Sequence, residues 1–510
     1  MSNRNENTIH PEVQKLVEQY TRGQLPRREF LKSAAKYAVA GITAEALVSA
    51  LTPRVASAAP AVKGKATDER PNIVFILADD LGYADLGVYG QTDFKTPNLD
   101  KLAREGVRFT QAYSNSAVCS ATRFALITGR YQYRLRGGLE EPLARADNGL
   151  GLPPEHPTLP SLLKASGYET ALIGKWHLGW PPNYGPLKSG YDYFFGNHGG
   201  AVDYFTHKPG VGENVLADLW EGEVRVERVG YYTQILADEA TRYIRTRNAG
   251  PGKPYFLSLH FTAPHWPWEG PGDEQSSREE VKNLFHYDGG NLKKYAEIVE
   301  ALDKAIGQVL AAIEQNGGGK NTIVVFSSDN GGERFSKTWP FSGQKTELLE
   351  GGLRVPALLR WPARLRPQVN HQVAITIDWL PTLLAAAGTA PHPDFPSDGE
   401  NLLPVLEGKA PEHARALFWR YKEQTQRAVR EGNLKYLKIN DNEFLFDVVV
   451  DQRERANLKD KQAADFNRLK SLWEKWDAQF LPITADVGTH GITPDIQADR
   501  YAPTSPRRRF

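Results

Sequence analysis

Cysteine is almost absent from the 510-residue sequence, which contains only Cys119. A single thiol cannot close an internal disulfide, so a disulfide framework is excluded. The sequence also lacks any Cys–His pattern with the spacing of a zinc site. A lone cysteine usually behaves as a small buried hydrophobe, and this interpretation of Cys119 has to be weighed against a reactive one.

An excess of charge of one sign is lacking too, because 62 basic and 61 acidic residues leave a formal net charge of +1. No overall field therefore favours nucleic acid or an anionic membrane as a partner, and anion binding has to be local. No internal repeat is visible. The length exceeds that of one compact core and suggests a large domain with a smaller companion.

Long apolar runs are lacking as well. The weakly apolar run at 37–51 is too short for a membrane span and contains a glutamate. It follows a pair of arginines at 27–28 and precedes the sequence Ala-Ser-Ala at 56–58, the order of a signal peptide with its cleavage site. We therefore predict a twin-arginine signal peptide with a long n-region at 1–58, and no stable membrane insertion. The Tat translocase would export the folded protein to the periplasm or the cell exterior; the alternative is a cytosolic amphipathic helix.

Residues 70–400 alternate strand-like and helix-like stretches. Apolar runs typical of strands buried on both faces occur at Ile73–Ala78, Tyr168–Ile173, Pro254–Phe261 and Thr322–Ser328. Helix patterns occur at Pro97–Glu105, Leu159–Ser166, Tyr231–Arg245 and Leu292–Gln315, the first with Thr96 expected as N-cap and Gly106 at C′. This alternation predicts an α/β domain with a large, mostly parallel sheet flanked by helices. The Gly-, Pro- and aromatic-rich stretch 181–227 is expected to be a loop insertion.

After Gly399 the pattern changes to short strands, at 417–419, 426–430, 434–439 and 444–446, followed by a helix at 463–480. Residues 401–485 are therefore expected to form a small C-terminal α+β subdomain, an antiparallel sheet with one packed helix. Residues 486–510 are expected to be a Pro/Arg-rich tail.

Candidate functional residues follow the predicted strands. Ligands of an open α/β sheet lie beyond the carboxyl ends of its strands. Four strand ends are followed by such residues, which are Asp79 and Asp80, Lys175 and His177, His265, and Asp329 and Asn330. Any one of these could be a helix cap, a turn or a structural histidine, but four at one edge of a sheet argue for a site.

The acidic members of this set predict a metal. Asp79, Asp80, Asp329 and Asn330 offer hard oxygen ligands, which Ca²⁺ or Mg²⁺ prefers and zinc does not. Three carboxylates crowded together without a cation would repel one another, so a divalent ion is expected among them.

Basic side chains surround the expected metal, and they are Arg123, Lys175, Lys345, His177 and His265. Cations and imidazoles around a metal suit a multiply charged oxyanion and can move protons near neutral pH. Cys119 precedes an apolar run that predicts the first turns of a helix. The free N–H groups at a helix N-terminus favour anionic chemistry. Arg123 lies one turn further along, on the same side of this predicted helix. The set predicts metal-assisted transfer of a phosphoryl-like or sulfuryl-like group.

The same segments resemble, in order, the motifs of the sulfatase family. Residues 119–123 (Cys-Ser-Ala-Thr-Arg), with Leu-Ile-Thr-Gly at 126–129, resemble its active-site signature, and 174–179 resemble the second signature. Other similar motifs lie at 76–82, 328–331, 343–345 and 350–356, and the resemblance runs from about Pro71 to Leu458. The chain is thereby identified as a formylglycine-dependent sulfatase of the alkaline phosphatase-like superfamily, similar to arylsulfatases and N-acetylgalactosamine sulfatases.

The resemblance implies a role for each candidate. Cys119 would be oxidised to formylglycine (3-oxoalanine), whose hydrate supplies the nucleophilic oxygen, and this residue would bind Ca²⁺, rather than Mg²⁺, together with Asp79, Asp80, Asp329 and Asn330. His265 and Lys345 would hold the sulfate and help to protonate the leaving oxygen. His177 would take a proton as sulfate is expelled, while Arg123 and Lys175 would steady the formylglycine and the sulfate charge.

One position departs from the family pattern, because Ala121 stands where most members have proline. Formylglycine-generating maturases read this pentapeptide, so the change bears on the efficiency of conversion and on which maturase acts. Two alternatives use the same residues: a phosphonate or phosphate monoester hydrolase on this scaffold, and an unconverted protein that binds sulfate esters.

The substrate is expected to be a small-molecule or oligosaccharide sulfate ester, with a sulfated saccharide favoured. Four aromatic residues lie near the motifs in sequence, which are Trp266, Trp268, Trp339 and Phe341. They either form a stacking wall for a sugar or aryl ring or pack the core.

Overall fold

The computed structural model describes residues 70–143, 149–210, 214–247, 252–280 and 290–492. The predicted signal peptide lies outside the described residues, as does the predicted tail beyond Ile492. Among the described helices, none is both long and apolar enough to cross a membrane.

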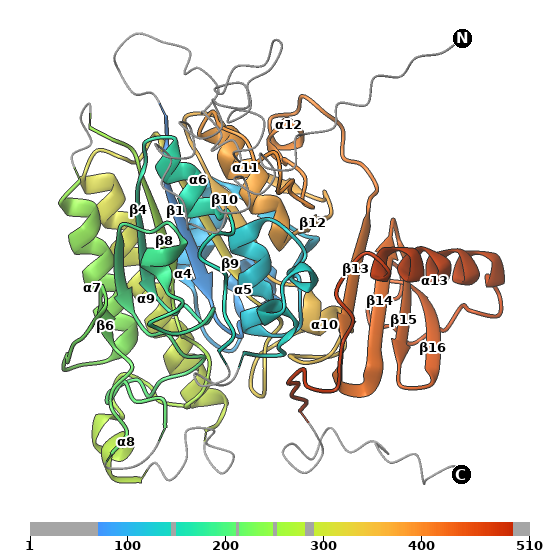
Figure 1. Cartoon of the computed structure of the whole chain (residues 1–510), viewed down its shortest axis with the longest axis horizontal. Coiled ribbons are helices and arrows are strands. Elements are labelled where there is room, and N and C mark those ends of the chain that lie inside the picture. Colours follow the sequence, from blue (N-terminus) through green and yellow to red (C-terminus); the bar gives the residue numbers. More distant parts are fainter. Residues whose placement is uncertain (1–69, 144–148, 211–213, 248–251, 281–289, 493–510) are drawn as a thin grey trace, which may run out of the picture. The chain divides into compact units, whose positions relative to one another are not determined.

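A ten-stranded mixed sheet forms the centre of the described part (Figure 1). Its strand order is β11-β2-β10-β9-β1-β8-β4-β5-β6-β7. The middle strands are β9 (Thr322–Ser328), β1 (Asn72–Ala78), β8 (Tyr255–His260), β4 (Glu169–Gly174) and β5 (Tyr193–Gly196), and they are all parallel. The outer strands are β11 (Gln368–Asn370), β2 (Val107–Phe109), β10 (Ala357–Arg360), β6 (Trp220–Glu221) and β7 (Val224–Arg225). The antiparallel pairs lie toward the edges, where β10 runs antiparallel to β9 and β6 to β5. The parallel central strands confirm the predicted mostly parallel sheet.

Alternate residues of β1 face two hydrophobic layers. Val74 and Ile76 belong to the layer that contains α4 (Pro97–Glu105), α7 (Tyr232–Arg245) and α9 (Leu292–Gln315). Ile73, Phe75 and Leu77 belong to the layer that contains α5 (Cys119–Thr128), α6 (Leu159–Ala165) and α11 (Trp379–Ala386). Helices therefore cover both faces of the central strands, which explains their continuous apolar sequences (Figure 1).

The C-terminal part is a four-stranded antiparallel sheet. It contains β13 (Ala416–Tyr421), β14 (Gln426–Glu431), β15 (Leu434–Ile439) and β16 (Asn442–Asp447), and α13 (Ala463–Asp477) packs against it. This sheet shares one hydrophobic cluster with Val118 and Ala121 at the start of α5. The Trp419 indole N–H donates a hydrogen bond of 2.8 Å to the Ser114 carbonyl. The small sheet therefore supports the helix that begins at Cys119.

The remaining α-helices and strands are short: β3 (Ala112–Tyr113), β12 (Ala374–Ile375), α8 (Glu274–Glu280), α10 (Glu350–Leu353) and α12 (Leu403–Leu406). Several local predictions need correction. The stretch 181–227 is not all loop, since β5 adds to the main sheet. Gly106 has an extended backbone rather than a left-handed one, and a Cβ there would lie 2.4 Å from the Leu359 carbonyl oxygen, so close packing requires this glycine. Thr96 does not cap α4 with its side chain, which instead accepts a hydrogen bond from the Gly87 N–H.

Candidate active site

The predicted site residues converge at the carboxyl edge of the central strands. Asp79 and Asp80 follow β1, Asp329 and Asn330 follow β9, Lys175 and His177 follow β4, His265 follows β8, and Cys119 begins α5. Together with Arg123 and Lys345, all ten residues are buried, each at most 4 % exposed. The parallel pairing of β1 with both β8 and β9 brings three of these strand ends to one place.

Carboxylates and the thiol form the centre of the site. One ligand atom from each of Asp79, Cys119 and Asp329 lies within 4.8 Å of the others, and the same holds for Asp79, Asp80 and His265. Successive side chains of an extended strand point to opposite faces. At Asp80 the backbone leaves the extended conformation and is left-handed, with φ of 62°, and here the neighbouring carboxylates of Asp79 and Asp80 come together.

Two buried oxygens of this centre lack partners. Asp79 Oδ1 and Asn330 Oδ1 accept no hydrogen bond from any described residue, although Asn330 Nδ2 donates one of 2.7 Å to Asp80 Oδ1. A buried unsatisfied acceptor costs about 1–3 kcal/mol. A divalent cation would satisfy both oxygens, so the donor set fits a metal that prefers oxygen ligands.

Three basic side chains pair with the carboxylates. Arg123 places Nε and Nη2 at 3.0 and 2.9 Å from Asp329 Oδ2. The Lys175 ammonium donates to Asp79 Oδ2, and the Lys345 ammonium lies 2.6 Å from Asp80 Oδ2.

These pairs shift the pKa values of the carboxyl groups in different directions. Burial tends to raise the pKa of Asp80, but Lys345 and His265 outweigh it and lower this pKa to about 2. Burial, and then the neighbouring Asp79 carboxylate, raise the pKa of Asp329 to about 7. The neighbouring cations therefore favour the ionised form of Asp80, whereas the ionised form of Asp329 would need a further cation near neutral pH.

Cys119 is not reactive as a thiol here. Burial raises its pKa to about 11, and the nearby Lys175 only partly opposes this. The nucleophilic form of cysteine is the thiolate, so the unmodified side chain stays protonated and inert at neutral pH.

Two neutral histidines complete the site. The His177 ring donates from Nε2 to the Leu143 carbonyl at 2.9 Å, which leaves Nδ1 as a buried acceptor with no partner among the described residues. His265 donates from Nδ1 to the Trp266 carbonyl at 2.7 Å, and its Nε2 lies 3.5 Å from Asp80 Oδ2. Burial lowers both pKa values well below the usual range, and neighbouring lysines lower them further.

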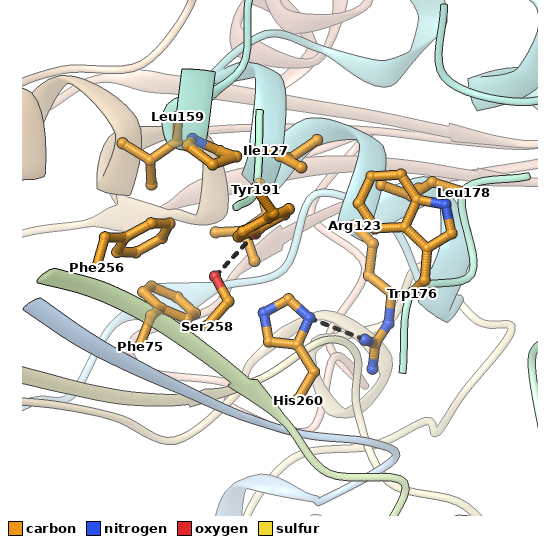
Figure 2. Close-up of a pocket in the computed structure, with 12 residues that line it drawn as sticks. Phe75, Arg123, Ile127, Leu159, Trp176, Leu178, Tyr191, Phe256, Ser258 and His260 are labelled. Carbon is orange, nitrogen blue, oxygen red and sulfur yellow. Dashed lines mark hydrogen bonds between the residues drawn. The ribbon is translucent and has the colours of Figure 1, made fainter. Parts of the chain in front are cut away.

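Sequence reasoning missed residues that contact this set. His260, the last residue of β8, places Nδ1 3.4 Å from Arg123 Nη1, as Figure 2 shows. Glu333 lies 3.5 Å from the Lys345 ammonium. A polar residue at the end of a buried strand was a usable signal for His260, whereas Glu333 follows a glycine-rich turn without any pattern.

Figure 2 shows the residues that line a small cavity, Arg123 among them. Its volume is about 20 Å³, and its lining is mostly apolar, with Phe75, Trp176 and Tyr191 among the residues. This is room for about one water molecule, so the cavity is not a substrate pocket.

The four aromatic residues near the motifs divide into two kinds. Trp268 and Phe341 are each 5 % exposed and belong to the core, so they form no stacking wall. Trp266 is partly exposed, its ring centroid lies 4.1 Å from that of His265, and the Lys345 ammonium lies 6.0 Å from the Trp266 ring. Trp339 is 57 % exposed, with the Arg453 guanidinium 5.2 Å from its ring.

Comparison with known proteins identifies the family. The Sulfatase family matches residues 71–389, and the family described as N-sulphoglucosamine sulphohydrolase, C-terminal, matches 343–479. The N-acetylgalactosamine-6-sulfatase of Rattus norvegicus is 35 % identical over 396 residues, covering 72 % of this chain and 71 % of that protein. The crystal structure of Ps i-CgsB in complex with k-i-k-neocarrahexaose superimposes with a TM-score of 0.73 at 29 % identity, covering 84 % of this chain and 96 % of that one. The chain therefore belongs to the sulfatase family and is a sulfuric ester hydrolase, as its motifs predicted.

Proposed function

We propose that the chain releases inorganic sulfate from a sulfated saccharide, using Ca²⁺ and a formylglycine formed from Cys119. The observation that carries the proposal is the buried convergence of Asp79, Cys119 and Asp329 within 4.8 Å, surrounded by three cationic side chains. Sulfatases as a family typically use a metal and formylglycine, and Cys119 lies beside two carboxylates of the expected metal site rather than among apolar core residues alone.

Four side chains would hold the metal: Asp79, Asp80, Asp329 and Asn330. Mg²⁺ demands near-octahedral geometry and keeps several waters, whereas Ca²⁺ accepts many protein oxygens, so this buried, oxygen-rich set favours Ca²⁺. The ion would offset the carboxylates and polarise a sulfate oxygen, and hydrated formylglycine would add a hard oxygen ligand and a nucleophilic oxygen that the thiol cannot provide.

The basic side chains would bind the sulfate group. Arg123, Lys175 and Lys345 balance the three aspartates, so a divalent ion leaves the site positively charged even when Glu333 is ionised. Burial opposes charging of Lys345, but Asp80 and Glu333 raise its pKa well above the usual range and keep it an ammonium. Lys345 would hold the sulfate and help to protonate the leaving oxygen. His265 would join it as the imidazolium, because its neutral form, with the Nδ1–H on the Trp266 carbonyl, has only a lone pair on Nε2.

We assign His177 the role of proton acceptor as sulfate leaves. Its Nε2–H is committed to the Leu143 carbonyl, so the lone pair is on Nδ1, which is buried and unpaired among the described residues. Arg123 and Lys175 are held by carboxylates and would steady residue 119 and the sulfate charge.

The saccharide preference rests on Trp266. An aromatic ring beside the sulfate-holding residues Lys345 and His265 can stack on a sugar ring. The names of the rat relative and of the Ps i-CgsB complex point to saccharides as well.

Burial also suggests when Cys119 is converted. Cys119 is 2 % exposed and Ala121 1 %, so in the folded chain a maturase cannot reach this pentapeptide. Conversion would therefore come before folding, and the twin-arginine signal predicted at 1–58 would then export the folded, modified protein through the Tat translocase to the periplasm or cell exterior.

The proposal is tested by sulfate release from 4-nitrophenyl sulfate and from a panel of monosulfated sugars, with 4-nitrophenyl phosphate as comparison. We expect turnover of sulfate esters that is lost in Cys119→Ala, and a reduced kcat/KM on sugars in Trp266→Ala. A preference for the phosphate ester by orders of magnitude would make the chain a phosphate or phosphonate monoester hydrolase. Equal sugar turnover by Trp266→Ala would remove the stacking argument.

A further inference from the structure

The chain after α13 returns to the active-site region as a segment that we call the C-terminal strap, residues 481–492. Its first half is held by two basic side chains at the end of β13, Arg420 within the strand and Lys422 just after it. Arg420 donates to the Leu481 carbonyl. Lys422 Nζ donates to three strap carbonyls, those of Thr484 (3.1 Å), Ala485 (3.0 Å) and Val487 (2.5 Å).

The second half of the strap binds the segment that follows α5. The Glu141 N–H donates to the Gly488 carbonyl at 3.0 Å, and the Gly488 N–H donates to Glu140 Oε2 at the same distance. The Thr489 hydroxyl donates to Glu141 Oε2 at 3.1 Å. These bonds fix the strap backbone at residues 488 and 489 although most of its side chains are exposed or half-buried.

The end of the strap reaches the loop that carries Lys345. The Tyr421 hydroxyl donates to the His490 carbonyl at 2.7 Å, and the Ile492 N–H donates to Thr346 Oγ1 at 3.3 Å. Thr346 directly follows Lys345, so the strap backbone lies against a sulfate-holding loop. His490 is held between these two bonds.

These two bonds hold the His490 backbone beside the loop that carries Lys345 and Thr346. Burial lowers its pKa, as does the nearby Lys345 ammonium, against the opposing effect of Asp80. The ring is only half-buried, and no described residue forms a hydrogen bond with it. By contrast, His177 and His265 each bind a backbone carbonyl with one ring nitrogen.

We propose that His490 binds the sugar portion of the substrate, through hydroxyl groups next to the sulfate ester. A neutral imidazole has one N–H donor and one acceptor, and a sugar hydroxyl can accept from the first and donate to the second. A simple aryl leaving group carries no hydroxyl, so the contact discriminates saccharide from aryl esters. This inference rests on the proposed function, whose sulfate-holding residues remain Lys345 and His265.

The test compares the fully converted wild type with His490→Ala, His490→Phe and His490→Asn. Each is assayed on the best-cleaved monosulfated sugar and on 4-nitrophenyl sulfate, and thermal unfolding is recorded for all four proteins. Phenylalanine keeps the ring shape without hydrogen bonding, and asparagine keeps a donor and an acceptor. We expect Ala and Phe to lose about tenfold in kcat/KM on the sugar, the effect of one or two hydrogen bonds, with the aryl ester within about twofold and Asn intermediate.

Three outcomes overturn the inference. Unchanged sugar kinetics in all variants would show that His490 makes no contact with the sugar. An equal loss on both substrates would mean that the residue serves the reacting group or the strap fold. A wild type that cleaves the aryl ester but no sugar would defeat the proposed substrate class itself, and this is seen before any variant is compared.

Discussion

Gly200 packs against the ring that we assign as proton acceptor, and a single added methyl group should disable it. A Cβ at this position would lie 2.6 Å from His177 Cε1 and 2.7 Å from Nε2. The backbone of Gly200 is not left-handed, so alanine adds no conformational strain and acts through this contact alone.

The size of the effect follows from contact distances. Nonbonded heavy atoms rest at about 3.5–4.0 Å, so the His177 ring has to move by roughly 0.9 Å or more. The hydrogen bond of 2.9 Å from Nε2 to the Leu143 carbonyl would then be stretched or lost, and with it the fixed position of Nδ1. A misplacement of about 1 Å can cost about a hundredfold in rate, so we expect kcat of Gly200→Ala to fall about 10- to 100-fold with KM little changed.

The assay is steady-state sulfate release from 4-nitrophenyl sulfate, with Gly199→Ala as the matched control. A Cβ at Gly199 would meet Asp218 Oδ2 at 3.0 Å and no atom of His177, so this variant should keep kcat within a few-fold. Equal thermal midpoints would show that both variants fold. Full activity of Gly200→Ala would refute the assignment of His177, since the ring would have moved without consequence.

Two further predictions concern the metal site and the junction with the small sheet. The pKa of Asp329 is near 7 before metal binds, so below pH 7 Ca²⁺ has to displace a proton from this carboxyl group. The apparent Kd for Ca²⁺ should therefore rise about tenfold for each pH unit below 7 and stay constant above pH 7. Calorimetric titration of unconverted protein between pH 5.5 and 8.5 measures this, and a constant Kd from 5.5 to 7.5 would contradict it. Lys435 is fully buried between Glu350 (3.0 Å) and Glu454 (2.9 Å). Lys435→Met would leave these two buried carboxylates without their cation, so the free energy of unfolding measured by urea titration should fall by about 3–5 kcal/mol. An unchanged unfolding midpoint would show that other groups compensate the carboxylate charges.

Local sequence signals were sufficient to predict the bounds of central helices and strands. The bounds of α9 and β9 are as predicted, because an amphipathic stripe and an apolar run both end at clear breakers, Gly317 and the Asp329-Asn330 turn. The position of the site followed from the same strands, since parallel strand ends meet at one edge.

Other elements have no local signal. β2, with three residues, and β10, with four, are strands because β9 and β11 offer pairing partners, not because of their own periodicity. β5 lies in an aromatic, glycine-rich stretch that resembles loop sequence.

No local sequence pattern predicted the contacts that distant residues make with the site. His490 stands next to Lys345 only because hydrogen bonds from Tyr421 and to Thr346 hold the strap there. Gly200 looks like part of an ordinary turn until the His177 ring is placed beside it. Such residues depend on tertiary contacts, which residue type and spacing do not encode.

The central claim is that Cys119 acts as the precursor of the catalytic group. The most direct measurement is the mass of the peptide containing residue 119, taken on the same samples in which sulfate release is assayed, across preparations with different extents of conversion. The account predicts that the peptide carries the lighter aldehyde residue and that kcat rises in proportion to the converted fraction, with Cys119→Ala inactive and folded. Full turnover by protein whose peptide retains an unmodified thiol would contradict it.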